Sequence, residues 1–182
     1  MVWRRVLSGD ERAFGVIWDR HSRRIIRHLV EMGNTATDAE DLSAATFMEL
    51  WRRRDSVRIV EGSVLPWLIV TARNVARNAA RARRRYRNLL ASLPPAGDTA
   101  DHAEFFAEQD SAWRVQLRAA IRKCRPLDAG LLAMTALEGF TAAEAGAAYG
   151  LSEAAAKMRI SRLRARLRST ISTNAVSEGG SR

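Results

Sequence analysis

The sequence predicts an all-α protein, built as two small helical domains joined by a flexible acidic linker. Every segment with regular hydrophobic spacing repeats at the helical period, and none alternates as a half-buried strand does. A length of 182 residues is enough for two small domains. Charge also divides the chain: residues 71–90 hold seven arginines and no acid, residues 92–112 hold five acids and no lysine or arginine, and residues 157–168 are basic again.

The acidic stretch marks the boundary between the two domains. Pro94 and Pro95 lie near its start and Gly97 follows them, a run that stops a helix. The end of the chain is rich in serine and glycine, which is typical of a disordered terminus. These features predict a first domain, an acidic linker, a second domain and a disordered tail, at residues 1–90, 91–112, 113–172 and 173–182.

The overall charge favours a polyanionic partner. The net charge is +10, and nearly all the positive charge is arginine. Nucleic acid is favoured because each neutralised phosphate releases counterions, whereas a membrane surface would require one strongly apolar helix face opposite the basic one. No run approaches the roughly 20 apolar residues of a membrane span, and the N-terminus lacks the apolar core of a secretory signal. We therefore expect a cytoplasmic protein without membrane insertion.

Capping signals place three helices in the first domain. Asp10 can cap the first helix, and Gly33 lies just past its end. Residues 37–40 (Thr-Asp-Ala-Glu) match a capping box, which predicts the start of the second helix there. Ser63 can cap the third helix, with Pro66 tolerated in its first turn.

The third helix carries the first pattern that indicates a function. Arg73, Arg77 and Arg81 recur every four residues and form one row, and Asn74 and Asn78 form the adjacent row on the same side. Arginine can contact phosphates and guanine edges, and asparagine can pair with adenine. A solvated helix face is the alternative, but no acid is interleaved to make the usual intrahelical ion pairs. The pattern therefore predicts a DNA-contacting face.

The second domain is predicted to end in a helix-turn-helix. A capping box at residues 141–144 starts a short helix that ends at Gly150, and Ser152 caps a longer helix that runs to about Ile171. The longer helix carries six basic residues: Lys157, Arg159, Arg162, Arg164, Arg166 and Arg168. Its first turn would enter the major groove while its later arginines hold phosphates. Helical hairpins that bind no DNA are common, so the spacing alone leaves that alternative open.

Together these segments resemble the extracytoplasmic-function (ECF) class of the sigma-70 family. Four motifs stand in the family's order: Gly-Asp-Glu-Arg-Ala-Phe at 9–14, Asp-Ala-Glu-Asp-Leu with Thr-Phe and Trp within 38–51, Trp-Leu with Ala-Arg-Asn within 67–74, and Glu-Gly, Gly-Leu-Ser and Lys-Met-Arg with two arginines within 138–164. The resemblance covers about residues 8–88 and 113–171. It implies a sigma region 2 bundle in the first domain and a sigma region 4 helix-turn-helix in the second.

The resemblance implies a subunit that binds core RNA polymerase through the β and β′ subunits, recognises the −10 and −35 promoter elements and promotes DNA melting. The implied polymerase-binding residues are Asp41, Leu42, Phe47 and Trp51. The implied −10 contacts are Arg58, Ser63, Trp67, Arg73, Asn74, Arg77, Asn78 and Arg81, with loop 58–63 as the pocket for a flipped base. The implied −35 contacts are Ser152, Lys157, Arg159, Arg162 and Arg164.

The chain departs from the family pattern at two places. Residues 44–45 are both alanine where the family usually has a polar pair, so the four polymerase-binding residues named above would carry recognition of the clamp. Ala145, Gly146 and Ala156 stand where the helix-turn-helix usually has larger side chains. The substitutions predict a thin core in that motif.

No group of residues in the sequence supports catalysis. His21 and His28 lie seven residues apart without an acidic partner placed for acid–base chemistry, and Cys124 is a packing residue rather than a redox sensor. We expect no catalytic residue, no metal and no cofactor, which disfavours a nucleic-acid-modifying enzyme. The other alternative is a helix-turn-helix transcriptional regulator that acts without replacing a sigma subunit. Because members of the ECF class often have a dedicated anti-sigma factor, the resemblance adds one to the candidate partners.

Overall fold

The computed structural model describes residues 2–91, 119–121 and 123–178. These residues form α-helices, one short 3-10 helix and turns, with no strand beyond an isolated bridge between Val60 and Ser63. The predicted all-α class is confirmed. Apart from Ala91, the predicted acidic linker lies outside the described residues.

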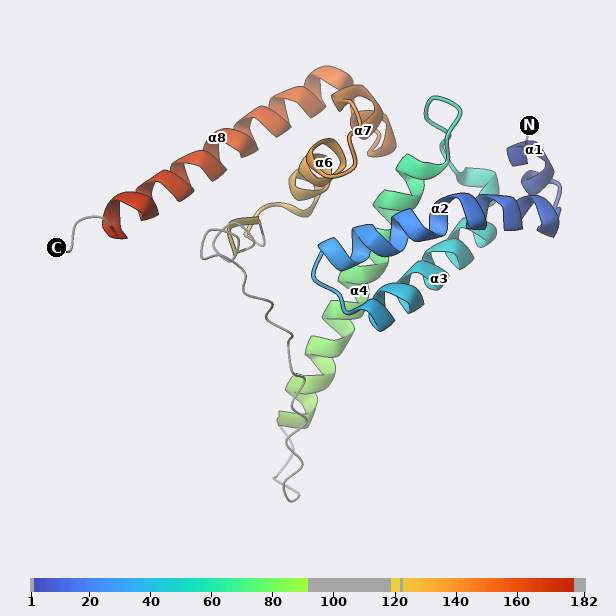
Figure 1. The fold of residues 1–182 in the computed structure, drawn as a ribbon, viewed down its shortest axis with the longest axis horizontal. Helices are drawn as coiled ribbons and strands as arrows, with labels where there is room; N and C mark the ends of the chain where they lie inside the picture. The colour runs from blue at the N-terminus through green and yellow to red at the C-terminus, as the bar shows by residue number, and fades with distance from the viewer. Residues whose placement is uncertain (1, 92–118, 122, 179–182) are drawn as a thin grey trace.

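The first domain is a bundle in which α2, α3 and α4 pack against one another, with α1 at the start of α2 (Figure 1). Its elements are α1 (Val2–Leu7), α2 (Glu11–Glu31), α3 (Ala36–Arg52), the 3-10 helix η1 (Arg54–Ser56) and α4 (Leu65–Ala91). The Asp10 carboxylate accepts the Ala13 N–H at 3.0 Å, which confirms the predicted cap of α2. Before α4, the Ser63 hydroxyl accepts the Leu65 N–H at 3.1 Å, but the residue at the N-cap position is Val64, whose carbonyl accepts the Leu68 N–H.

The start of α3 differs from the prediction. The helix begins at Ala36, and the cap is Thr35, whose hydroxyl accepts the Asp38 N–H at 3.1 Å. Thr37 also fits the sequence pattern of a cap, but only Thr35 has the extended backbone that an N-cap needs, with φ −64° and ψ 162°. The predicted capping box at 37–40 is therefore wrong by two residues, and Thr37 lies inside the helix.

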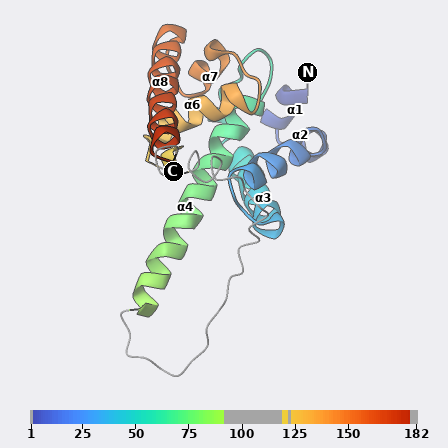
Figure 2. The same ribbon diagram turned by 60° about the vertical axis from the view of Figure 1, so that its left-hand side comes forward.

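The core of the first domain is made of large side chains. Ile25 and Leu29 from α2, Leu50 from α3 and Leu68 and Ile69 from α4 are fully buried. Complete burial of a side chain of this size stabilises the fold by about 1.5–3 kcal/mol. This core fixes the direction of α4, whose C-terminal half projects beyond the rest of the bundle (Figure 2).

The second domain contains the predicted helix-turn-helix. Its elements are α6 (Pro126–Ala136), α7 (Ala142–Ala148) and α8 (Glu153–Glu178). The capping box is confirmed: the Thr141 hydroxyl accepts the Glu144 N–H, and the Glu144 carboxylate accepts the Thr141 N–H. Gly150 has φ 72° in the turn, a left-handed conformation that favours glycine.

Helix α8 is longer than predicted. It continues to Glu178, seven residues past the expected end at Ile171, so residues 173–178 are helical rather than part of a disordered tail. No proline or glycine interrupts the helix before Gly179, so no residue there breaks the backbone pattern. The position of the first glycine in the tail therefore indicates the end of α8 better than the composition of the tail does.

The core of the helix-turn-helix is close-packed rather than hollow. Ala145 and Ala156 are fully buried, and Gly146 lies directly against the start of α8. A Cβ added to Gly146 would lie 3.0 Å from the Ala156 Cβ and 3.2 Å from the Leu151 carbonyl oxygen. The small residues let α7 and α8 approach closely, so the predicted thin core has no space left to fill.

The two domains pack against each other in this structure. Helices α6 and α7 lie beside the N-terminal half of α4 (Figures 1 and 2). One hydrophobic cluster includes Leu68 and Ala76 of α4 together with Leu131, Met134 and Ala145 of the second domain. This continuous core gives the domains a defined mutual position.

Candidate nucleic-acid interface

The second domain covers part of the predicted arginine and asparagine rows of α4 and leaves the rest exposed. Asn74, Asn78 and Arg81 are exposed, as a DNA-contacting face requires. Arg77 is half-buried, and Arg73 is only 9% exposed. The arginine row is therefore covered at its start in this structure, whereas Arg81 and the asparagine row are open to solvent.

Tyr149, from the turn after α7, is the residue that lies against Arg73. Burial raises the pKa of the Tyr149 phenol, while the charge and a hydrogen bond from Arg73 act in the opposite direction. The tyrosine ring fits beside α6 because residue 130 is glycine, and a Cβ at Gly130 would overlap the Tyr149 hydroxyl. Gly130 thus leaves the space that lets Tyr149 reach α4.

The arginines of α4 repel one another. Burial lowers the pKa of Arg77, and the nearby guanidinium groups of Arg81 and Arg73 lower it further. Arginine keeps its charge even so, because its usual pKa is far above neutrality. A row of like charges that has no acidic partner among the described residues would be stabilised by a polyanion bound along this face.

The loop before α4 contacts the second domain as well. Arg58 is exposed, and its guanidinium donates to the Ala147 carbonyl at 3.0 Å. Glu61 and Gly62 both have positive φ, 48° and 72°, which makes the tight turn that the Val60–Ser63 bridge closes. Trp67, in the first turn of α4, is half-buried.

Helix α8 presents its predicted DNA-contacting residues to solvent. Ser152 caps the helix by accepting the Ala155 N–H at 3.3 Å. Two of its basic residues have acidic partners, because Lys157 pairs with Glu153 at 2.6 Å and Arg159 pairs with Asp128 of α6 at 2.9 Å. Exposed Arg162 and Arg164 have no ion-pair partner among the described residues.

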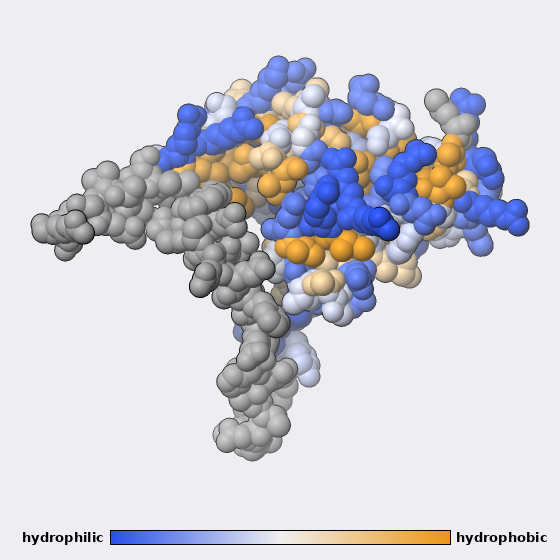
Figure 3. Space-filling model, viewed as in Figure 1, coloured by the Kyte–Doolittle hydropathy of each residue, from blue (hydrophilic) through white to orange (hydrophobic). Residues whose placement is uncertain are grey.

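A basic groove of about 430 Å³ lies between α8 and the end of α6. Its polar lining consists of Thr135, Lys157, Ser161, Arg164 and Arg168. The outer edge of α8 is hydrophilic, with apolar residues between it and α6 (Figure 3). Cationic and hydroxyl groups that lie together in one groove can donate hydrogen bonds to phosphate oxygens.

The predicted polymerase-binding residues on α3 do not all face outward. Asp41 is exposed and Trp51 is half-buried, but Leu42 is 7% exposed and Phe47 is 1% exposed. Leu42 and Phe47 are core residues, because they lie on the side of α3 that faces α2 and α4. Both residues pack in the core of this structure, and their assignment as polymerase contacts stays a prediction.

Met48 is the residue that the prediction missed on this face. It is 67% exposed and lines an open, mainly apolar groove of about 460 Å³ between α2 and α3. The apolar lining residues are Phe14, Trp18, Ala44, Phe47, Met48 and Trp51. Positions 41, 44, 48 and 51 follow helical spacing, and this periodicity could have placed Met48 on the outer face.

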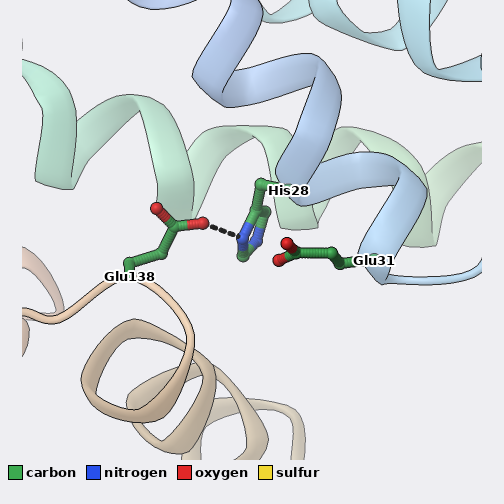
Figure 4. Close-up of side chains that lie close together, drawn as sticks. All are labelled: His28, Glu31 and Glu138. Carbon is green, nitrogen blue, oxygen red and sulfur yellow. Dashed lines mark hydrogen bonds and ion pairs between the residues drawn. The ribbon is translucent and has the colours of Figure 1, made fainter.

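An ion-pair cluster joins α2 to the turn after α6. The sequence shows the residue types of its members but not that they lie together. The Glu138 carboxylate, 2% exposed, accepts from Arg24 at 2.8 Å and lies 2.7 Å from His28 Nδ1 (Figure 4). Arg24 also donates to the Glu138 carbonyl at 2.6 Å. Burial raises the pKa of Glu138, but hydrogen bonds and charges from His28 and Arg24 outweigh it and leave that pKa below its usual value.

Glu31 lies on the other side of the His28 ring from Glu138 (Figure 4). Ligand atoms of His28, Glu31 and Glu138 lie within 4.8 Å of one another, a spacing that a metal ion could bridge. Both carboxylate oxygens of Glu138 are already engaged, one by His28 and one by the cationic Arg24. A cation placed there would face the Arg24 charge, so the donor set fits an ion-pair network better than a metal centre.

The comparisons with known proteins agree on one family. Residues 17–86, which span most of α2, all of α3 and most of α4, match the model of sigma-70 region 2. The RNA polymerase sigma factor CarQ of Myxococcus xanthus is 31% identical over 162 residues, which cover 87% of this chain and 88% of CarQ. The sigma factor CnrH of Cupriavidus metallidurans is 32% identical over 168 residues, covering 88% and 87%. The ECF sigma factor BldN of Streptomyces coelicolor is 26% identical over 84% of this chain and 58% of BldN.

The chain belongs to the ECF class of the sigma-70 family of RNA polymerase sigma factors. The solved structure of CnrH in complex with the cytosolic domain of CnrY supports the same conclusion. It matches this sigma factor with a TM-score of 0.60 and 26% identity, covering 99% of this chain and 97% of CnrH. Within the residues that the structure describes, no helix of this sigma factor is both long and apolar enough to cross a membrane.

Proposed function

We propose that this sigma factor binds core RNA polymerase, reads the −10 and −35 promoter elements with α4 and α8, and promotes DNA melting between them. Two long basic helices on separate domains carry the proposal, because each presents exposed cations that could contact DNA. In this proposal region 2 spans residues 1–90, the linker 91–112 and region 4 residues 113–172. The match to sigma-70 region 2 supports the first of these assignments.

The outer face of α3 is the proposed contact with the polymerase clamp, in the β′ subunit. Asp41 supplies an exposed carboxylate, and Met48 and Trp51 supply an apolar surface beside it. Interfaces draw much of their affinity from such a buried apolar centre with a polar rim. In this proposal the apolar groove takes over the role of the polar pair that the family usually has at the positions of Ala44 and Ala45. The flap of the β subunit is the proposed partner of the second domain.

The proposed −10 surface consists of the exposed part of α4 and its preceding loop. Asn74 and Asn78 are placed to read bases, and Arg77 and Arg81 to hold phosphates. The turn at residues 58–63 lies at the start of this face, where an extruded base could be held against Trp67. Polymerase supplies the chemistry of RNA synthesis, and the sigma subunit needs no catalytic group or cofactor.

The proposed −35 surface is the first three turns of α8. Ser152 and Lys157 lie at the end that would enter the major groove, and Arg162 and Arg164 face phosphates on either side. Arg159 is tied to Asp128 and so orients α8 on α6 as well as contributing charge. The exposed cations suit promoter DNA as the partner of this surface. A promoter-binding protein acts in the cytoplasm. The complex of CnrH with CnrY supports an anti-sigma factor as a further partner.

Mixing the pure chain with core polymerase on a sizing column tests the proposal. We expect co-elution, and Met48→Asp should weaken binding about tenfold or more by placing a charge at an apolar centre. Val30→Asp is the matched control, since Val30 is an exposed apolar residue of α2 outside the groove. Specific promoter binding by the chain alone, with no affinity for core polymerase, would instead support a regulator that acts without replacing a sigma subunit.

A further inference from the structure

The end of α4 projects beyond the bundle as an arm formed by residues 81–89 (Figure 2). Every residue of this arm is exposed, whereas the preceding residues 65–79 include the side chains that pack in the core. The arm carries several arginines and no acid: Arg81, Arg83, Arg84, Arg85 and Arg87. Like charges three or four residues apart on a helix repel one another, and the exposed arm has no buried side chain to offset this repulsion. The arm is therefore a surface that a polyanion would stabilise.

The arm continues the proposed DNA-contacting face of α4 past the bundle. Arg84 and Arg85 follow Arg81 by three and four residues, and Asn88 follows it by seven. These spacings place the four side chains on the side of the helix that carries Arg77. The basic face therefore runs about two turns further than the residues assigned to the −10 element.

Ion pairing distinguishes this side of the arm from the opposite one. Arg83 points back to the bundle, where its guanidinium lies 3.2 Å from the Asp38 carboxylate. Among the residues that the structure describes, Arg84 and Arg85 have no acidic partner. The first domain thus uses one arginine to hold the arm and leaves the arginines of the DNA-contacting face available.

We propose that the arm binds the phosphate backbone of double-stranded promoter DNA immediately upstream of the −10 element, with Arg84 and Arg85 as its phosphate contacts. The inference rests on the proposed function, in which α4 reads the −10 element. In that function the strands separate at the loop of residues 58–63, which precedes α4. The other end of the helix therefore lies toward DNA that is still paired and that leads to the −35 element.

The length and composition of the arm define the contact. From Asn78 to Asn88 the helix rises about 15 Å, at about 1.5 Å per residue, which matches about four base pairs of about 3.4 Å each. Residues 79–87 contain no asparagine or glutamine that could pair with bases. We therefore expect the arm to add affinity across all spacer sequences, because phosphate contacts carry no sequence information.

Uncharged backbone linkages in promoter DNA test the contact in the complex of the full-length chain with core polymerase. One duplex is a promoter selected from a random library by this complex, and the second carries neutral methylphosphonates over the roughly four base pairs upstream of its −10 element. At about 0.1 M salt, Arg85→Ala should bind the ordinary duplex about 3- to 10-fold more weakly than the wild type, the size of one lost counterion-release contact. The two proteins should bind the methylphosphonate duplex equally, because it lacks the charge that Arg85 contacts.

Arg87→Ala is the matched control, since Arg87 is an exposed arginine of the same arm, two residues further on and on the other side of the helix. It should bind both duplexes like the wild type. No loss of affinity for Arg85→Ala, an equal loss on both duplexes, or an equal loss for Arg87→Ala would overturn the contact. Weaker co-elution of Arg85→Ala with core polymerase in the absence of DNA would also overturn it, because the arm would then bind protein.

The same duplexes with altered −10 sequences separate this contact from the proposed function. Asn74→Ala should change the −10 preference whether or not the arm binds the spacer. An unaffected Arg85→Ala protein together with an altered preference for Asn74→Ala would overturn the arm and leave the proposed function intact. The reverse result would support the phosphate contact of the arm and contradict base reading by α4.

Discussion

Helices α4 and α8 are both long and rich in arginine, yet they meet solvent differently. On α4 the first arginine of the row lies under the other domain, whereas on α8 Arg162 and Arg164 are exposed. The two helices are also held in place differently, α4 by large apolar side chains such as Leu68 and α8 by the close approach of Ala156 to α7. Tertiary contacts therefore decide whether a basic helix is exposed to solvent or covered, and the sequence of the helix alone does not.

The attachment of α8 gives the largest expected effect. Ala156→Val should lower the free energy of unfolding by about 1–3 kcal/mol, because the space around Ala156 is already filled by Gly146 and an added methyl group has no room. Urea denaturation of the full chain measures the change. Ala154→Val is the matched control, since Ala154 is exposed in the same turn and introduces the same β-branched side chain. A more stable Ala156→Val protein would show that a cavity exists there and that small residues do not hold α8 by close packing.

The free and paired arginines of α8 give a smaller effect that separates their roles. Arg162→Ala should weaken promoter complexes across all sequences and lower the salt slope by about one unit, if Arg162 neutralises one phosphate. Arg159→Ala should change the slope less, because the Arg159 guanidinium already pairs with Asp128 at 2.9 Å. Promoter affinity of the polymerase complex at several salt concentrations measures both. Equal slopes for the wild type and Arg162→Ala would remove α8 from the set of phosphate contacts.

Local chemistry made much of the fold predictable. Asp10, Thr141 and Glu144 were recognisable because each side chain accepts a hydrogen bond from a backbone N–H three residues away. The start of α3 was harder, since Thr35 and Thr37 both fit the pattern and only the backbone conformation distinguishes them. The apolar positions of α3 showed that it packs, but not that Phe47 faces inward while Met48 faces solvent.

The candidate site was less predictable where it depends on contacts between distant residues. His28 and Glu138 lie 110 positions apart, and no local spacing links them. Tyr149 reaches Arg73 only because Gly130 on a third segment leaves room for its ring. The rows of α4 and α8 could be read from residue type and period, but the cover over Arg73 follows from tertiary packing alone.

Permanganate reactivity of promoter DNA tests the central claim most directly, namely that this chain lets core polymerase recognise and open promoters. A promoter library should be incubated with core polymerase and the chain, with unpaired thymines mapped in each member. The account predicts melting near the −10 element only when both components are present. It also predicts that Asn74→Ala changes the preferred −10 bases, by about 1–3 kcal/mol at the position that Asn74 reads, and leaves the −35 preference unchanged. No melting above that of core polymerase alone, or identical promoter preferences for the wild type and Asn74→Ala, would contradict it.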